Sequence, residues 1–538
     1  MAEPETNTSP AAPAPGASPW SPFRHATFSI LWTATVVANV GTWMYNAAAG
    51  WLITTLTPEP QIVSLVQVAT SIPMFLFALP AGALADILDK RRLLLTVVAG
   101  LMAVSTTIAA LVSLKLVSPS VLLFFTFLLG TGAALTAPAW QAMVPALVPR
   151  QNLAPAVAAN SVGVNISRAV GPALGGALIA GFGVAMPFWL NALSNIGILA
   201  ALMWWRPPPR PAGHLPAERF TGALRAGFRH ARHNPHLHAT LIRAVAFFLF
   251  ASAYWALLPL VARDRITGGP GLYGFMLGAI GAGAIGGAFI LPWLRLRLGP
   301  DRVVAAGTIG TAIALVLFGL AREPVTGLTA SAMAGVSWIW VLASFNVSAQ
   351  VALPDWVRGR GLAMFVTVFF GAISVGSALW GQVAGLIGLS ATHLAAAAGA
   401  LAMIPLTWRW KLQTGAGHDL TASMHWPAPV IDRDIVPDQG PVLVTVEYRV
   451  KSEHRDAFVD ALETLGRERR RDGAYAWGLF EDAAQDGRFI ETFLVESWLE
   501  HLRQHDRVTE ADRALQSMVH SHLDGAPAVT HYVAAGPR

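Results

Sequence analysis

The sequence predicts an α-helical membrane protein: a twelve-helix bundle in two halves of six, followed by a small α+β soluble domain. Composition is the first reason, since 54% of the 538 residues are hydrophobic and only 13% are charged, about half the charged fraction of soluble domains. The second is that 30 of the 68 charged side chains lie in residues 438–538. The third is a series of apolar stretches, each long enough to cross a hydrocarbon core of ~30 Å.

The first residues, 1–22, are rich in Pro and Ala and lack the basic start and apolar run of a signal peptide, so we expect a disordered tail. Domains are then expected at 23–205 (first six-helix half), 206–238 (cytoplasmic linker), 239–410 (second half), 411–440 (linker) and 441–538 (cytoplasmic α+β domain). The expected spans are 28–55, 62–86, 93–114, 119–144, 155–180, 184–205, 239–262, 271–293, 302–321, 325–349, 361–386 and 388–408.

Lys and Arg set the predicted orientation, because short basic loops stay in the cytoplasm. Loops on one side of the twelve spans hold fifteen basic residues and those on the other side hold four. Both termini are therefore expected in the cytoplasm, with the bundle in the inner (plasma) membrane. In the long linker, Phe220, Leu224 and Phe228 recur every four residues between arginines, which predicts an amphipathic helix on the membrane surface.

The two halves carry matching segments. The run Gly171-Pro172-Ala173-Leu174-Gly175-Gly176 aligns with Gly376-Ser377-Ala378-Leu379-Trp380-Gly381 at an offset of 205, and two other matches occur at offsets of 209 and 212. Such duplication predicts a pseudo-symmetric bundle with its substrate cavity between the halves near the bilayer midplane.

Several function classes are disfavoured. With no cysteine, the chain has no disulfide, thiolate metal site or Cys nucleophile, and we expect no bound metal and no cofactor. The pI near 9.9 comes from the membrane loops, because the last 101 residues carry 18 acidic against 12 basic side chains. Nucleic acid is therefore not an expected partner.

The loop after the second span combines a small residue, an acid at a helix end and a basic cluster. Gly82, Asp86, Lys90, Arg91 and Arg92 hold these positions and resemble the cytoplasmic loop signature of the major facilitator superfamily. The pattern departs from that signature at Ile87 and Asp89. The resemblance implies a gate, in which Gly82 permits close helix contact and an ion pair of Asp86 holds one conformation.

Two further segments narrow the resemblance. Gly171, Pro172, Gly175 and Gly176 resemble the fifth-helix motif of exporters in this superfamily, where small residues permit tight packing. With Trp43 and the run Leu353-Pro354-Asp355-Trp356-Val357-Arg358-Gly359-Arg360, they resemble the enterobactin-exporter-type branch, the transmembrane secretion effectors. The resemblance implies secondary active export of a small organic molecule (siderophore, drug or secondary metabolite), usually by proton antiport, and gating roles for Asp355, Arg358 and Arg360.

The residues themselves give less support to proton coupling. No Asp or Glu lies in mid-span, so Asp86 and His393 are the remaining groups that could carry a proton. Arg168 is the clearest anomaly, since an intramembrane arginine is costly and should face a cavity or a partner.

The helices that line the pathway in this superfamily carry amides and aromatic rings on shared faces. This chemistry suits a bulky, aromatic-bearing substrate better than an inorganic ion. A lipid-flipping bundle of the same fold remains an alternative. The predicted pathway residues are Asn39, Trp43, Asn46, Arg168, Arg243, Tyr254, Trp338 and Asn346.

The C-terminal segment alternates apolar and polar residues from Val442 to Val450 and then reads as βαββαβ, a ferredoxin-like order. It resembles dimeric α+β barrel domains, which implies self-association over an aromatic sheet face. An enzymatic reading, in which Trp477 with His454 or His505 serves a monooxygenase-like reaction, stays open beside a regulatory one.

Overall fold

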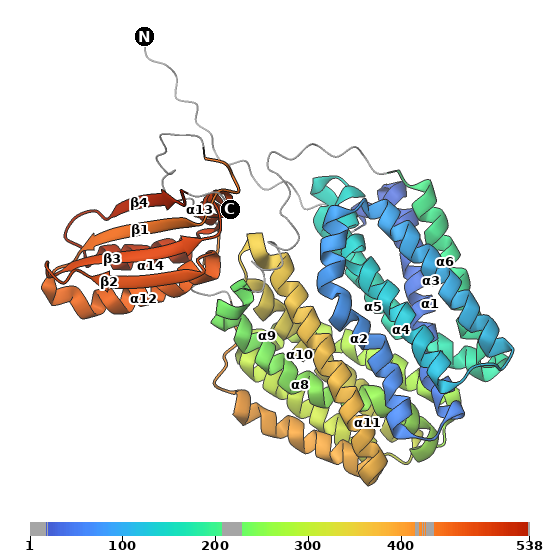
Figure 1. Ribbon diagram of the computed structural model, residues 1–538. Coiled ribbons are helices and arrows are strands. Elements are labelled where there is room, and N and C mark those ends of the chain that lie inside the picture. Colours follow the sequence, from blue (N-terminus) through green and yellow to red (C-terminus); the bar gives the residue numbers. More distant parts are fainter. Residues whose placement is uncertain are drawn as a thin grey trace.

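The protein was analysed as a computed structural model that describes residues 18, 20–206, 229–414, 419–421, 423, 425, 426 and 435–535. Most of the predicted N-terminal tail and the predicted amphipathic helix at 220–228 lie outside these residues. Figure 1 shows two groups of helices side by side, with the small sheet domain beyond one end of them.

The first half contains six long helices, and polar caps or prolines mark where several of them begin. Asp89 and Ser118 accept backbone hydrogen bonds at the starts of α3 and α4, which satisfies N–H groups that a helix start leaves free. The helices are α1 (Ala26–Leu56), α2 (Pro60–Ile87), α3 (Lys90–Ser113), α4 (Pro119–Met143), α5 (Leu153–Phe182) and α6 (Ala185–Trp204).

The second half contains α8 (Pro235–Leu260), α9 (Gly269–Leu320), α10 (Pro324–Val351) and α11 (Asp355–Thr407). At 52 and 53 residues, α9 and α11 are each more than twice as long as a membrane crossing needs. Each is broken by a glycine with positive φ, Gly299 at 72° and Gly388 at 79°. Nine helices of the described chain are long and apolar enough to cross a membrane. With both broken helices counted as two and α1 included, the twelve predicted spans are present.

The internal repeat is visible in how the halves touch. A Cβ on Gly176 of α5 would lie 2.8 Å from the carbonyl oxygen of Pro270 in α9, and one on Gly381 of α11 would lie 3.2 Å from that of Pro60 in α2. These contacts occupy matching positions in the two repeats, and both join one half to the other. The same equivalence holds for contacts within each half: Gly171 with Val40, and Gly376 with Leu249.

The C-terminal domain has the predicted topology. Strands β1 (Val442–Arg449), β2 (Ala476–Glu481), β3 (Arg488–Val495) and β4 (Ala528–Val533) form an antiparallel sheet in the order β2-β3-β1-β4. Helices α12 (Arg455–Asp472), α13 (Trp498–Arg507) and α14 (Glu510–His520) accompany it, with α12 and α14 on one face (Figure 1). The expected single helix at 498–522 is two helices, because a capping box at Thr509 and Asp512 starts a new one.

The predicted linker 411–440 is in part a component of this domain. Ser423 donates a backbone hydrogen bond to Val508, and the ring of Trp426 lies under Arg469 at 4.5 Å from the guanidinium carbon. The described residues Ser423 and Trp426 therefore pack against the helices of this domain.

Candidate functional site

Three of the predicted pathway residues come together where the halves meet. Arg168 of α5 lies over the ring of Trp43 of α1, 5.5 Å from the ring centroid. Arg168 is also within electrostatic range of Tyr254 on α8, in the other half. A cation and two aromatic rings from both halves thus share one region, as alternating access between two repeats requires.

Arg168 has no carboxylate partner among the described residues, and its guanidinium donates no hydrogen bond to any of them. Its Nε is buried without an acceptor. The Tyr254 hydroxyl, with the side chain fully buried, also forms no well-aligned hydrogen bond within the described chain, although the side chain of Trp255 lies close enough to act on it. Buried polar groups are normally paired, so two groups without well-aligned hydrogen bonds at one place indicate a site for a ligand.

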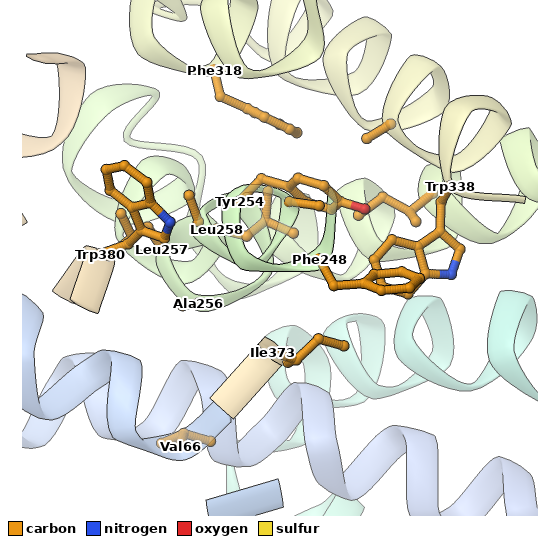
Figure 2. Close-up of a cluster of buried hydrophobic side chains, with 14 of the residues drawn as sticks. Val66, Phe248, Tyr254, Ala256, Leu257, Leu258, Phe318, Trp338, Ile373 and Trp380 are labelled. Carbon is orange, nitrogen blue, oxygen red and sulfur yellow. The ribbon is translucent and has the colours of Figure 1, made fainter. Parts of the chain in front are cut away.

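A cluster of aromatic side chains packs around Tyr254 and Trp338. Trp338 of α10 lies 6.4 Å from Tyr254, 5.5 Å from Trp255 and 5.1 Å from Phe248 between ring centroids. Figure 2 shows Phe248 beside Trp338 and Tyr254 lying between Phe318 and Trp338. The predicted residues Tyr254 and Trp338 are therefore in contact range, and Trp338 is nearly buried in the second half.

The predicted asparagines differ from one another. Asn39 and Asn46 of α1 are half-buried, and their amides make no hydrogen bond to described residues. Asn346 of α10 is also half-buried, but its amide nitrogen donates to the Leu342 carbonyl of its own helix at 3.0 Å. The side-chain amides of Asn39 and Asn46 can therefore hydrogen bond to a ligand, whereas the Asn346 amide nitrogen already donates one hydrogen bond to its own helix.

Arg243, another predicted pathway residue, is engaged in an ion pair within the second half. It is 5% exposed and forms an ion pair with Asp301, whose carboxylate also accepts the Leu412 backbone N–H at 3.1 Å. Its position near the start of α8 lets the long side chain reach Asp301 at the start of the second part of α9. A cavity of only about 20 Å³, roughly one water, lies beside it within the second half.

The residues predicted to form the gate in the first half make their described contacts within that half. Arg91 donates to the carbonyls of Leu202 and Met203 at 3.0 and 2.7 Å, so it caps the C-terminus of α6, and Lys90 donates to the Ala142 carbonyl at 3.2 Å. Arg92 contributes its backbone N–H to the cap at Asp89. The side chains of Asp86 and Asp355 lie outside the described residues.

The described residues show no close contact at Gly82. A Cβ placed on Gly82 would meet no atom of the described chain within 4 Å. At the opposite end the halves do touch, where Arg263 binds the Thr54 carbonyl and Tyr273 packs against Gly50. Contact at that end explains the open space at Gly82, because alternating access closes one side at a time.

His393 lies away from the interface between the halves. Its ring is fully buried beside Phe318, at 6.2 Å, and its Nδ1 pairs with the Leu389 carbonyl at 2.7 Å. The glycines of the predicted helix-packing motif lie against neighbouring helices. Gly171 and Gly175 face Trp43 and Met44 of α1, and Gly176 faces the other half.

The Leu353–Arg360 segment meets the C-terminal domain. Arg507 of α13 lies over the ring of Trp356, 4.4 Å from the centroid, and also binds Glu500 at 2.6 Å. Glu500 accepts a hydrogen bond from Arg229, in the helical residues 229–233 before α8, at 3.2 Å. Arg358 is exposed and Arg360 half-buried on the following turn. The sequence did not predict this contact, because neither segment carries a local pattern that indicates which residues it packs against.

His230 lies inside the same contact, with its ring 5.4 Å from that of Trp356. Burial lowers the pKa of His230 to about 3, and the charges of Arg471, Arg507 and Arg229 add to the effect. The imidazole is therefore neutral while the domain is docked.

The three residues considered for a monooxygenase-like reaction, Trp477, His454 and His505, each lie beside different side chains. Trp477 donates to the buried Glu491 at 2.9 Å, which also accepts from Tyr448 at 2.8 Å. The ring of His454 faces His522, and that of His505 faces His501. The structure does not bring Trp477, His454 and His505 together.

Two six-helix halves related by a repeat, with unpaired polar groups between them, define a transporter of the major facilitator type. The chain belongs to the transmembrane secretion effector family, whose profile matches residues 17–537. The enterobactin exporter EntS of Shigella boydii serotype 4 (strain Sb227) is 28% identical over 366 residues, 66% of this chain and 85% of the relative. EntS of Escherichia coli O1:K1 / APEC matches to the same extent.

Solved transporter structures share the fold. A variant of the nucleoside transporter NupG gives a TM-score of 0.61 at 11% identity, covering 71% of this chain and 99% of that one. An auto-inhibited POT family peptide transporter gives 0.59 at 13% identity, covering 73% and 98%. A bacterial homologue of the lysosomal transporter Spinster gives 0.55 at 15% identity, covering 73% and 98%. The protein is thus a multi-pass membrane transporter with a small-molecule substrate.

Proposed function

We propose that the protein exports a small organic molecule that carries aromatic rings and anionic or oxygen-rich groups, such as a siderophore, by alternating access. The observation that supports this most directly is Arg168, which lies over Trp43 without an acidic partner among the described residues and within electrostatic range of Tyr254 in the other half. A guanidinium binds oxygen anions through a fork of N–H donors, and flanking rings stack on an aromatic substrate. The similarity to enterobactin exporters supports the direction of transport.

The proposed orientation has both termini in the cytoplasm, with the bundle in the inner membrane. The fifteen basic residues in loops on one side support it. In that orientation the contacts of Arg263 with Thr54 and of Gly176 with α9 close the outer side. The structure then corresponds to a state that takes substrate from the cytoplasm.

Asp86, Lys90, Arg91 and Arg92, with Asp355, Arg358 and Arg360, are proposed to form the inner gate. Protons are the proposed coupling ion, with Asp86 as the group that releases them. Asp86→Asn should then slow transport more than it weakens substrate binding, because Asp86 belongs to the gate and not to the cavity. A large loss of affinity with unchanged turnover would contradict this role.

The C-terminal domain is proposed to regulate transport through its contact with Trp356, the residue beside Asp355. Its open sheet face leaves Phe480 61% and Tyr532 54% exposed, and pairing with a second copy would cover both.

The test of the proposed function is release of substrate by cells that lack their own exporters. Cells that make enterobactin and express the chain should release it faster than cells with an empty vector. A panel of dyes, antibiotics and other siderophores would define the substrate range. Release that matches the empty vector for every compound, with the protein present in the membrane, would refute the proposal.

A further inference from the structure

Three histidines of the C-terminal domain converge although none is part of the transport pathway. His501 and His505 are four residues apart on α13, which places them on one helix face, and His531 lies on β4. In the sheet register His531 is opposite Val444, a buried residue, so it is on the helix-covered face. One ring nitrogen of each histidine lies within 4.8 Å of the other two.

We propose that His501, His505 and His531 form a binding site for one first-row divalent transition-metal ion, with Zn²⁺ as the representative ion. Three imidazoles and one water are a common tetrahedral ligand set for zinc. Imidazole also suits copper, iron and nickel, so geometry and metal supply decide among them.

The spacing of the two helix ligands fits this chemistry. The Nε2 atoms of His501 and His505 are 3.3 Å apart. Two nitrogens bound to one tetrahedral Zn²⁺ at 2.0–2.1 Å lie about 3.3 Å from each other. His531 is half-buried, so rotation of its ring can close the remaining gap.

The surroundings of the site also suit an ion. His501 is 1% exposed, and the buried side-chain amide of Gln504 lies close enough to act on its ring as a hydrogen-bonding group. Neither His501 Nδ1 nor the Gln504 amide forms a well-aligned hydrogen bond within the described chain. With a metal on Nε2, the Nδ1–H of His501 can donate to the Gln504 oxygen, the outer bond that metal-bound histidines usually make.

The charges near the site do not oppose a cation strongly. Arg469 is the cation that acts on His501, and it is paired with the fully buried Glu491 at 3.3 Å. The rings of Trp498 and Trp426 pack beside His501 and His505 at 5.4 and 5.1 Å and shield them from water.

Metal binding to the full-length protein tests the site. The protein is purified in detergent without a polyhistidine tag, stripped with a chelator, and titrated with Zn²⁺ and Co²⁺. We expect one high-affinity ion per chain and the visible absorption of tetrahedral Co²⁺. His505→Gln and His531→Gln, both at half-buried positions, should each weaken binding at least ~10-fold, since even outer partners of metal ligands cost that much.

His454→Gln is the matched control, because His454 also lies beside another histidine, His522, at 5.5 Å between ring centroids in the same domain, but the two belong to no three-ligand group among the described residues. It should leave the affinity unchanged. The same affinity in wild type and His505→Gln, with the variant folded by circular dichroism, would show that the ion binds elsewhere. No stoichiometric binding by wild type would show that the three histidines only hydrogen bond with one another.

Discussion

At the scale of single residues, two intramembrane arginines have opposite surroundings. Arg168 has no acidic partner among the described residues and lies over Trp43 between the halves. We expect Arg168→Ala to lower transport by about 10–100-fold, the value of one hydrogen bond to a charged group. Folding should be preserved, and Arg168→Lys should restore part of the activity because the planar fork is lost.

Initial export rates and thermal unfolding of the same purified variants check this prediction. The matched control is Arg297→Ala, since Arg297 also lies over a tryptophan, Trp293 at 4.5 Å, but away from Trp43 and Tyr254. Arg297→Ala should transport normally. Unfolding of Arg168→Ala at a much lower temperature would mean that Arg168 is structural.

Arg243 provides the opposite case, because it is paired with Asp301. Arg243→Ala leaves that carboxylate without its cation and should cost roughly 2 kcal/mol, less than a fully buried pair because Asp301 is 23% exposed. A lower unfolding temperature is the expected result. Asp301→Asn combined with Arg243→Gln should recover much of the loss. An unchanged unfolding temperature in Arg243→Ala would contradict the structural role.

At the scale of elements, the crossing of α5 and α9 depends on Gly176. A Cβ there would meet Gly274 and Pro270, whereas one on Gly181, five residues later in α5, would meet no described atom within 4 Å. Gly176→Val should therefore hold the outer ends of the halves apart and abolish transport, while Gly181→Val should transport normally. Labelling of an introduced cysteine beside Tyr273 should increase in Gly176→Val. Equal transport in both variants would exclude a closing role for this contact.

The docked C-terminal domain should respond to pH through His230. Its pKa is about 3 when docked, against an ordinary value near 6.5. Undocking then takes up a proton between these values, so protonation of His230 does not oppose docking above pH 6.5 and weakens docking by up to about tenfold per pH unit below it. Arg229, His233, Arg471 and Arg507 are the charged or titratable groups that act on it.

Spin labels at Leu88→Cys and Met518→Cys can report docking, because both positions are exposed and the chain has no native cysteine. The distance distribution should broaden from pH 7.5 to 5.5, and His230→Gln should remove this change. The same broadening with glutamine at 230 would assign it to another group.

At the scale of the whole molecule, the sequence predicted what periodicity and composition control. Twelve apolar spans, the repeat and the βαββαβ order follow from local patterns, so the helices and the sheet were predictable. Partners distant in sequence were not. Arg243 and Tyr254 were predicted from one helix face, and the sequence could not show that Arg243 pairs with Asp301 while Tyr254 lies within electrostatic range of Arg168. Nor could it find His531 opposite α13, although the four-residue spacing of His501 and His505 was a visible signal.

We propose that an aromatic, oxygen-rich molecule crosses between the halves past Arg168. The decisive measurement is the uptake of labelled enterobactin into inside-out membrane vesicles that hold wild type, Arg168→Ala or Arg297→Ala in matched amounts. Wild type and Arg297→Ala should show uptake that depends on an energised membrane, and Arg168→Ala should show little. Equal uptake by wild type and Arg168→Ala, above vesicles without the protein, would contradict it.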